Sequence, residues 1–179
     1  SPFLNHKVSR NLPFDAFGLL ALFSSRLGDV IEMARRHSVQ TVAHITVAEG
    51  SGQAAGFEFC GGKAAIIPAQ KGIYAHANHV VGKKLKSLVT AGNQITSAAG
   101  ASHHRQKRLY ELMEQNRGRL TPQIMLQNLS DHENYPISIC SHRDKENHTT
   151  ACVIAEPTRG LLHVTRGAPC QNWPITYKL

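Results

Sequence analysis

The spacing of hydrophobic residues predicts two helices followed by a strand in the first part of this chain. Residues 14–23 are almost all apolar, and in residues 29–36 apolar and charged positions alternate at helical spacing. In residues 43–47 the period changes, because apolar residues now alternate with His44 and Thr46. Alternation at every second residue is the pattern of a strand with one buried face.

Glycine-rich turns divide the next part of the chain into short apolar segments. Gly50, Gly52, Gly61 and Gly62 supply the turns, since glycine adopts the backbone conformations that tight turns need. The segments between and after them predict three further strands, at residues 53–59, 64–68 and 72–77. Strands in this order predict an antiparallel meander.

A helical period returns in the middle of the chain. A helix is predicted from residue 103 to about residue 116, with apolar residues on one face and Ser102 as its N-cap. The Thr121-Pro122 pair then starts a second helix that reaches Asp131, because proline fits the first helical turn.

Two more strands complete the pattern, at residues 150–155 and 160–165, joined by a turn that contains Pro157. Meanders of strands with helices packed outside them predict an α+β layered domain. The 179 residues and the hydrophobic content of 41 % suffice for one core, so residues 1–179 are expected to form a single domain.

The longest apolar run is far shorter than the roughly 20 residues of a bilayer crossing, and no basic-then-apolar leader precedes it, so no membrane partner is expected.

Charge and cysteine content narrow the functional class. The formal net charge of +8 suits nucleic acid, an anionic surface or a phosphate-bearing small molecule. Basic residues cluster at 83–86 and at 105–119, but only 6 % of residues are aromatic, too few for a platform that stacks single strands. Solvated faces of a loop and a helix are the simpler interpretation of both clusters. The four cysteines are widely spaced, and we expect them to be reduced.

Three motifs carry more specific information. Residues 76–79 read His-Ala-Asn-His, residues 131–140 read Asp-His-Glu-Asn-Tyr-Pro-Ile-Ser-Ile-Cys, and residues 167–170 read Gly-Ala-Pro-Cys. In this order the motifs resemble those of the penicillin acyltransferase family of N-terminal-nucleophile hydrolases, the family of isopenicillin N acyltransferase. The resemblance runs from about Gly28 to Cys170 and is specific in these three motifs.

The resemblance implies a fold and a reaction. The family folds as a four-layer αββα sandwich, in which two antiparallel sheets stack between helical layers, and the predicted order of elements agrees with this fold. Its members attack an amide or thioester with a cysteine that self-cleavage frees at a chain N-terminus. No cysteine precedes Cys60 here. We therefore expect the nucleophile outside these residues, and interpret the chain as the C-terminal portion or one subunit of a larger αββα enzyme.

Asn78 is the principal catalytic candidate. It is predicted at the end of a strand, where its amide can point into a cleft, and the resemblance implies that it donates to the oxyanion of the tetrahedral intermediate. From the residues alone, an asparagine that closes a turn is the simpler interpretation. His76 is expected in the substrate site. His76 and His79 would face opposite sides of a strand, which makes them poor ligands for one metal ion.

The resemblance also implies an arginine directly after the Ile-Cys pair, but Ser141 occupies that position. Arg143 lies one strand period further on, so we expect Arg143 to take the catalytic role beside Ser141 in the substrate site; alternatively, this chain lacks the interaction. Glu58 is a further expected substrate contact, because its carboxylate lies opposite Phe57 and Phe59 and could orient an ammonium group. It could equally be a solvent-facing strand residue.

Asp131 and His132 allow two interpretations. They could hold the turn from helix to strand by hydrogen bonds, or take part in catalysis. Cys140 and Cys170 have no free α-amine beside them and are expected to pack in the interior.

No metal site is expected, because the histidine pairs at 103–104 and at 142 and 148 have no cysteine or carboxylate at a familiar ligand spacing. Ser1 has its own α-amine as a base, but Pro2 follows it and the strand expected of a nucleophile is missing, so Ser1 is not expected to attack.

The sequence thus predicts part of a cysteine N-terminal-nucleophile amidohydrolase or acyltransferase that acts on amide or thioester bonds. Its expected partners are a second polypeptide segment carrying the cysteine and a small-molecule amide or acyl-coenzyme A substrate. No cofactor and no nucleic acid are expected. Two alternatives stay open: a non-catalytic small-molecule-binding protein on the same scaffold, and a basic nucleic-acid-binding domain. A cytoplasmic location is expected, since the C-terminal Tyr-Lys-Leu only faintly resembles the peroxisomal Ser-Lys-Leu signal.

Overall fold

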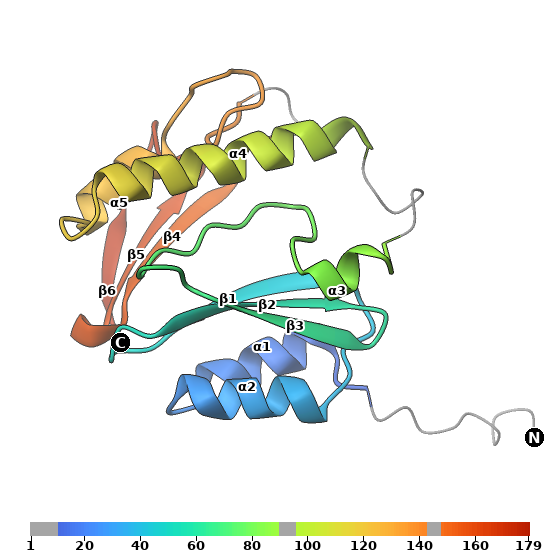
Figure 1. The fold of residues 1–179 in the computed structure, drawn as a ribbon. Helices are drawn as coiled ribbons and strands as arrows, with labels where there is room; N and C mark the ends of the chain where they lie inside the picture. The colour runs from blue at the N-terminus through green and yellow to red at the C-terminus, as the bar shows by residue number, and fades with distance from the viewer. Residues whose placement is uncertain (1–10, 90–95, 143–147) are drawn as a thin grey trace, which may run out of the picture. The chain divides into compact units, whose positions relative to one another are not determined.

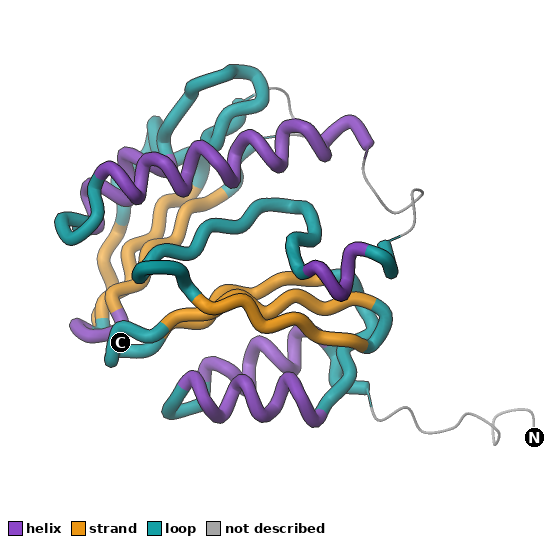
Figure 2. Tube along the Cα trace, in the orientation of Figure 1, coloured by secondary structure: helices purple, strands orange, loops and turns teal. Residues whose placement is uncertain are grey.

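The computed structural model describes residues 11–89, 96–142 and 148–179, which fall into two compact units (Figure 1). The first unit contains the described parts of residues 1–49, 53–69 and 80–90. The second contains residues 50–52 and 70–79 and the described parts of residues 91–179. Each unit combines helices with one three-stranded antiparallel sheet (Figure 2).

The sheet of the first unit has the order β1-β2-β3, and helices α1 and α2 pack against it. The elements of this unit are α1 (Phe14–Leu22), α2 (Leu27–Arg36), β1 (Ala43–Ala48), β2 (Ala54–Cys60), β3 (Lys63–Pro68) and α3 (Lys83–Lys86).

Three phenylalanines form the centre of this unit's core. Phe17 of α1 and Phe57 and Phe59 of β2 are 0 % exposed, and the ring centroids of Phe17 and Phe59 lie 4.8 Å apart. Because side chains alternate across a strand, Glu58 points to the opposite face of the sheet. Leu85 of the short α3 is also buried, and α3 packs against β3.

The sheet of the second unit has the order β4-β5-β6, and α5 packs against both α4 and β4. The elements of this unit are α4 (Thr96–Gln115), α5 (Pro122–Leu129), β4 (Ala151–Glu156), the 3-10 turn η1 (Pro157–Arg159), β5 (Leu161–Arg166) and β6 (Ile175–Lys178). No helix among the described residues is long and apolar enough to span a membrane.

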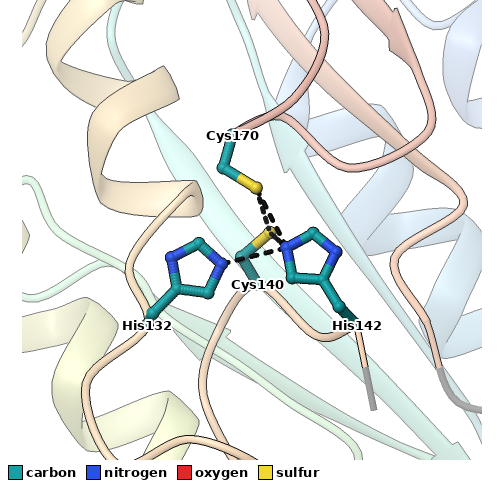
Figure 3. A group of neighbouring side chains, drawn as sticks. All are labelled: His132, Cys140, His142 and Cys170. Atoms are coloured by element: carbon teal, nitrogen blue, oxygen red, sulfur yellow. Dashed lines mark hydrogen bonds between the residues drawn. The ribbon is translucent and has the colours of Figure 1, made fainter. Parts of the chain in front are cut away.

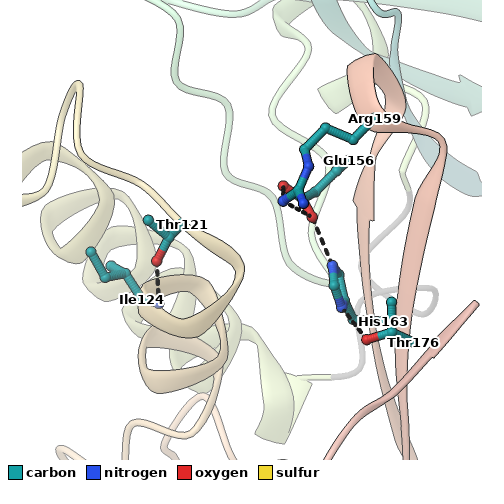
Figure 4. Close-up of polar contacts among 6 residues, drawn as sticks. All are labelled: Thr121, Ile124, Glu156, Arg159, His163 and Thr176. Atoms are coloured by element: carbon teal, nitrogen blue, oxygen red, sulfur yellow. Dashed lines mark hydrogen bonds and ion pairs between the residues drawn. The ribbon is translucent and has the colours of Figure 1, made fainter.

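Most of the elements predicted from hydrophobic periodicity are confirmed: both early helices, the first three strands, the helix at Pro122 and the two strands around Pro157. The hydroxyl of Thr121 caps α5 by accepting the N–H of Ile124 at 3.3 Å (Figure 4). Thr121 and Pro122 therefore start this helix as their residue types predict. The final strand β6 is short and was not predicted.

The strand predicted at residues 72–77 is wrong. The chain makes a tight turn through Lys71 and Gly72, both at positive φ (51° and 79°), which leaves one isolated bridge between Gln70 and Ile73. After Ile73, the backbone carbonyl of Ala75 accepts a hydrogen bond from a side chain, Gln106 Nε2 of α4, at 2.9 Å. Backbone groups that are satisfied in this way need no neighbouring strand.

Two further predictions about local structure are wrong. Ser102 is not an N-cap, because α4 already begins at Thr96 and the buried Ser102 hydroxyl bonds a distant segment. The segment before Cys140 forms turns rather than a strand, and the Cys140 N–H donates back to the carbonyl of Asp131 at 3.0 Å. Two residues after Cys140, His142 makes an isolated antiparallel bridge with His148.

Candidate functional site

Asn78 is held by two residues of helix α4 in the second unit. Its backbone N–H donates to Ser102 Oγ at 2.7 Å, and its Oδ1 accepts from Arg105 Nη2 at 2.7 Å. Ser102 and Arg105 are three residues apart, so they lie on the same face of the helix. A guanidinium only donates, so the contact requires the amide oxygen on that side. The exposed amide nitrogen Nδ2 then faces away and has no bonded partner among the described residues.

The guanidinium of Arg105 is partly buried, and burial lowers its pKa from the ordinary value. It remains charged all the same, because arginine does not deprotonate in proteins. A positive charge on the oxygen side of an amide polarises the group and makes its N–H bonds better donors. The sequence marks Arg105 only as one of the basic residues at 105–119, and nothing in the local pattern indicates its contact with Asn78.

A series of aromatic rings lies beside Asn78. Successive ring centroids of Tyr74, His76, His79 and His103 are 6.2, 6.1 and 3.7 Å apart, and each pair is stacked. The prediction that His76 and His79 face opposite sides of a strand is therefore wrong. His79 Nδ1 also lies 2.8 Å from Ser102 Oγ. Because that oxygen accepts the Asn78 N–H, its own proton is available to His79.

Glu58 belongs to the first unit and is 1 % exposed, so the solvent-facing interpretation is wrong. Its carboxylate accepts the backbone N–H groups of Val81 at 2.8 Å and Gly82 at 2.7 Å. A Cβ on Gly82 would lie 2.8 Å from both Glu58 Oε2 and Ala65 Cβ. Glu58 thus holds the segment after residue 80 against the sheet, and a substrate role for it stays a prediction.

Ser141 is half-buried and pairs with Thr149: its N–H donates to Thr149 Oγ1 at 3.0 Å, and its carbonyl accepts the Thr149 N–H at 2.9 Å. Its neighbour in the prediction, Arg143, lies outside the described residues. The proposed replacement of the family arginine by Arg143 therefore stays a prediction.

Arg108 of α4 and Arg117, which follows that helix, are paired with carboxylates of the protein. Arg108 reaches Asp131 and Glu133, each at 2.8 Å, and Arg117 pairs with Glu114. The hydrogen bond from Arg108 lowers the pKa of Asp131 and, in return, raises that of Arg108. The Asp131 carboxylate also accepts the N–H of Glu133 at 3.1 Å. These bonds confirm the structural interpretation of Asp131, which holds the turn after α5.

Four side chains converge a few residues away from this ion pair (Figure 3). They are His132, Cys140, His142 and Cys170, and we refer to them as the His-Cys cluster. Their ligand atoms, one per residue, all lie within 4.8 Å of one another. The Cys140-Ser141-His142 triplet places a cysteine two residues from His142, which is the one signal of the cluster in the sequence that the prediction of no metal site overlooked. Cys170 could be added only from the fold, since 28 residues separate it from His142.

The thiol of Cys140 is a poor nucleophile by itself. Burial, followed by the hydrogen bond to Cys170, raises its pKa to about 11, and the thiolate is the attacking species. The side chain is 0 % exposed. This agrees with the expectation that Cys140 packs, whereas Cys170 is exposed and so its expected burial is wrong.

A family model described as acyl-coenzyme A:6-aminopenicillanic acid acyl-transferase matches residues 18–171. The chain belongs to this acyltransferase family. The match spans all three motifs and confirms the penicillin acyltransferase resemblance. The mixed α+β structure with two small antiparallel sheets is consistent with the α+β fold of the acyltransferase family. Membership suggests an acyltransferase-like or amidohydrolase-like activity. A search of curated proteins gave no significant match.

Proposed function

We propose that this chain is part of an enzyme that transfers or hydrolyses acyl groups, and that Asn78 stabilises the oxyanion formed at an amide or thioester carbonyl. The observation that carries the proposal is the hydrogen bond between Arg105 and Asn78 Oδ1, which leaves the Nδ2–H group facing outward. Membership of the acyltransferase family supports the reaction class. A preorganised donor of this kind accelerates acyl transfer because it needs no reorientation when charge develops.

The nucleophile in this proposal is a cysteine at the N-terminus of another polypeptide segment, as the family resemblance implies. Its own α-amine takes the thiol proton, and the sulfur bonds to the carbonyl carbon while the carbonyl electrons move to oxygen. Asn78 donates to that oxygen. When the oxyanion collapses, the bond to the leaving amine or thiol breaks, and the α-ammonium protonates the leaving group. Water or an amine then takes the acyl group from the thioester and restores the thiol.

The internal cysteines support this assignment of the nucleophile. Cys140 is buried and has a raised pKa, and Cys60 and Cys152 are buried as well. None of the three has an α-amine beside it that could accept the thiol proton. Cys170 is exposed, but its sulfur lies 3.0 Å from His142 Nε2 within the His-Cys cluster.

We propose an acyl-coenzyme A or a small amide as the substrate. The description of the family supports the coenzyme A thioester. Lys83, Lys84 and Lys86 of α3 are exposed, and basic side chains of this kind suit the phosphates of coenzyme A. We also propose that the chain forms part of a four-layer αββα sandwich, which one helix-backed sheet in each unit supports.

Acyl-enzyme trapping tests the proposed function. The native protein is incubated with an acyl thioester and quenched in acid, and the acyl group is located by mass spectrometry together with N-terminal sequencing. We expect a companion segment that begins with cysteine and carries the acyl group. An acyl group on Cys140 or Cys170 would contradict the proposed nucleophile, and a protein that binds the thioester without acylation would be a binding protein.

A further inference from the structure

The His-Cys cluster has the dimensions of a tetrahedral metal site. Cys140 Sγ and Cys170 Sγ are 3.6 Å apart, and His132 Nε2 and His142 Nε2 are 3.0 Å apart. The mixed pairs from His142 Nε2 are 3.6 Å to Cys140 Sγ and 3.0 Å to Cys170 Sγ. Around zinc, with Zn–S of about 2.3 Å and Zn–N of about 2.0–2.1 Å, the edges of a tetrahedron are about 3.8 Å between sulfurs and about 3.3 Å between nitrogens.

Hydrogen bonding within the cluster does not account for this convergence. His142 Nε2 lies within 3.0–3.6 Å of one nitrogen and two sulfurs. A ring nitrogen carries either one proton or one lone pair, so it makes one good hydrogen bond and not three. A cation at the centre would instead engage one lone pair from each of the four side chains.

We propose that His132, Cys140, His142 and Cys170 bind one Zn²⁺ ion in a closed, structural site. Two thiolates and two imidazoles are the ligand set of many structural zinc sites. The soft sulfur ligands select zinc over magnesium or calcium, which prefer oxygen. Binding replaces the two thiol protons, so the two thiolates offset the charge of the ion and the protons go to solvent.

Hydrogen bonds outside the cluster support Cys140 and the segment that carries His132. The Cys140 N–H donates to the carbonyl of Asp131 at 3.0 Å, which places the thiol beside His132. The Asp131 carboxylate is held in turn by Arg108 at 2.8 Å. Ser138 Oγ donates to the carbonyl of Cys140 at 2.6 Å. Supports of this kind orient metal ligands and are part of a functioning site.

Cys170, the remaining ligand, comes from a turn that is distant in the sequence. Gly167 has a φ of 88° and donates its N–H to the carbonyl of Thr150 at 2.7 Å, at the end of β5. Asn172 Nδ2 donates to the carbonyl of Ala168 at 2.9 Å and closes the turn around Cys170. The proposed ion would therefore join the segment after α5 to the turn after β5.

All four positions of the proposed tetrahedron are filled by the protein, so the site keeps no position for substrate. The inference does not depend on the proposed acyl transfer, because none of its ligands takes part in that reaction. His132 and Cys170 are exposed, which gives an ion a path to the buried Cys140.

Metal analysis of the reduced, full-length protein as isolated tests the site. We expect one Zn²⁺ per chain, and after replacement by Co²⁺ the visible absorption bands of tetrahedral, thiolate-bound cobalt. Cys170→Ser and His132→Gln should each weaken zinc binding by more than about 100-fold in a chelator competition, since each removes a ligand. Both residues are exposed, and His148→Gln is the matched control because His148 pairs with His142 but lies outside the cluster. Zinc affinity of the control should equal that of the wild type.

Several results would overturn the site. The site is excluded if the reduced wild type takes up neither Zn²⁺ nor Co²⁺ at one equivalent, or if the cobalt spectrum lacks the thiolate bands. This measurement uses the wild type and therefore does not depend on whether a variant folds. A disulfide between Cys140 and Cys170 in protein isolated without reductant, found by peptide mapping after alkylation, would also exclude it. So would wild-type zinc affinity in both ligand variants.

Discussion

Arg105 Nη2 donates to Asn78 Oδ1 over 2.7 Å, and this contact determines which end of the Asn78 amide faces outward. The substitution Asn78→Asp keeps the shape and the contact with Arg105, but replaces the outward donor by an acceptor. We expect it to lower kcat by about 10²–10³, as the loss of one oxyanion donor does. Steady-state kinetics of the complete enzyme measure this, with circular dichroism to verify the fold. Unchanged turnover would remove Asn78 from the reaction.

Arg105 is a positioning residue in this scheme, and its removal should act through Asn78. In Arg105→Met the amide loses the partner that orients it, and we expect kcat to fall by about 10-fold to 100-fold with little change in KM. Arg105→Lys keeps a cationic donor and should recover part of the loss.

Lys107→Met is the matched control, since Lys107 lies on the same helix, is 79 % exposed and pairs only loosely with Glu111 at 3.8 Å. Its kcat should equal that of the wild type. If Arg105→Met raised KM alone, the residue would contact substrate and would not position Asn78.

Glu58 should matter for stability. Glu58→Gln turns one carboxylate oxygen into a donor that faces the backbone N–H of Val81 or Gly82, so a buried bond is lost. We expect the free energy of unfolding to fall by about 1–3 kcal/mol. Urea denaturation measures it, and Glu32→Gln, at an exposed position of α2, is the control. Equal midpoints for Glu58→Gln and the wild type would contradict the assigned role.

Gly82→Ala tests the contact between Glu58 and Gly82 by changing the glycine. The added methyl would lie 2.8 Å from Ala65 Cβ and from Glu58 Oε2, and a strand Cβ cannot move away as a long side chain can. We expect a loss of about 1–3 kcal/mol in urea denaturation, the usual cost of overpacking. Gly100→Ala, where nothing lies within 4 Å of the new methyl, should not destabilise the protein.

The pH dependence of stability should include a contribution from Glu156. The hydrogen bond from His163 at 2.8 Å, followed by Arg159, lowers the pKa of Glu156 below its ordinary value of 4.5 (Figure 4). A carboxyl group with a depressed pKa in the folded state stabilises that state above its unfolded pKa. The contribution is lost as the pH falls below about 4.5. The difference in unfolding free energy between the wild type and Glu156→Gln should therefore shrink in acid, and a constant difference would contradict the ion pair.

Local patterns were predicted well where the governing interaction was itself local. The alternation of Phe57, Glu58 and Phe59 assigned their faces correctly, because a strand turns every second residue to one side. The strand predicted at residues 72–77 failed because the partner of Ala75 is Gln106, 31 residues later. No periodicity within the segment reports such a contact.

In the candidate site, too, local features were predicted from the sequence and contacts between distant residues were not. Asn78 was identified from a motif, but its orientation depends on Arg105, 27 residues away. Ser102 was chosen as an N-cap from its residue type, while its hydroxyl is used by the backbone of Asn78. The His-Cys cluster joins residues from a turn after α5 and a turn after β5, and only the folded chain places them together.

Helix α4 contacts both Asn78 and the segment that carries His132. Ser102 and Arg105 hold Asn78, and Arg108, one turn further along, holds Asp131 next to His132. Should the proposed zinc ion change the affinity of a transition-state analogue at Asn78, thermodynamic reciprocity requires the analogue to change zinc affinity by the same factor.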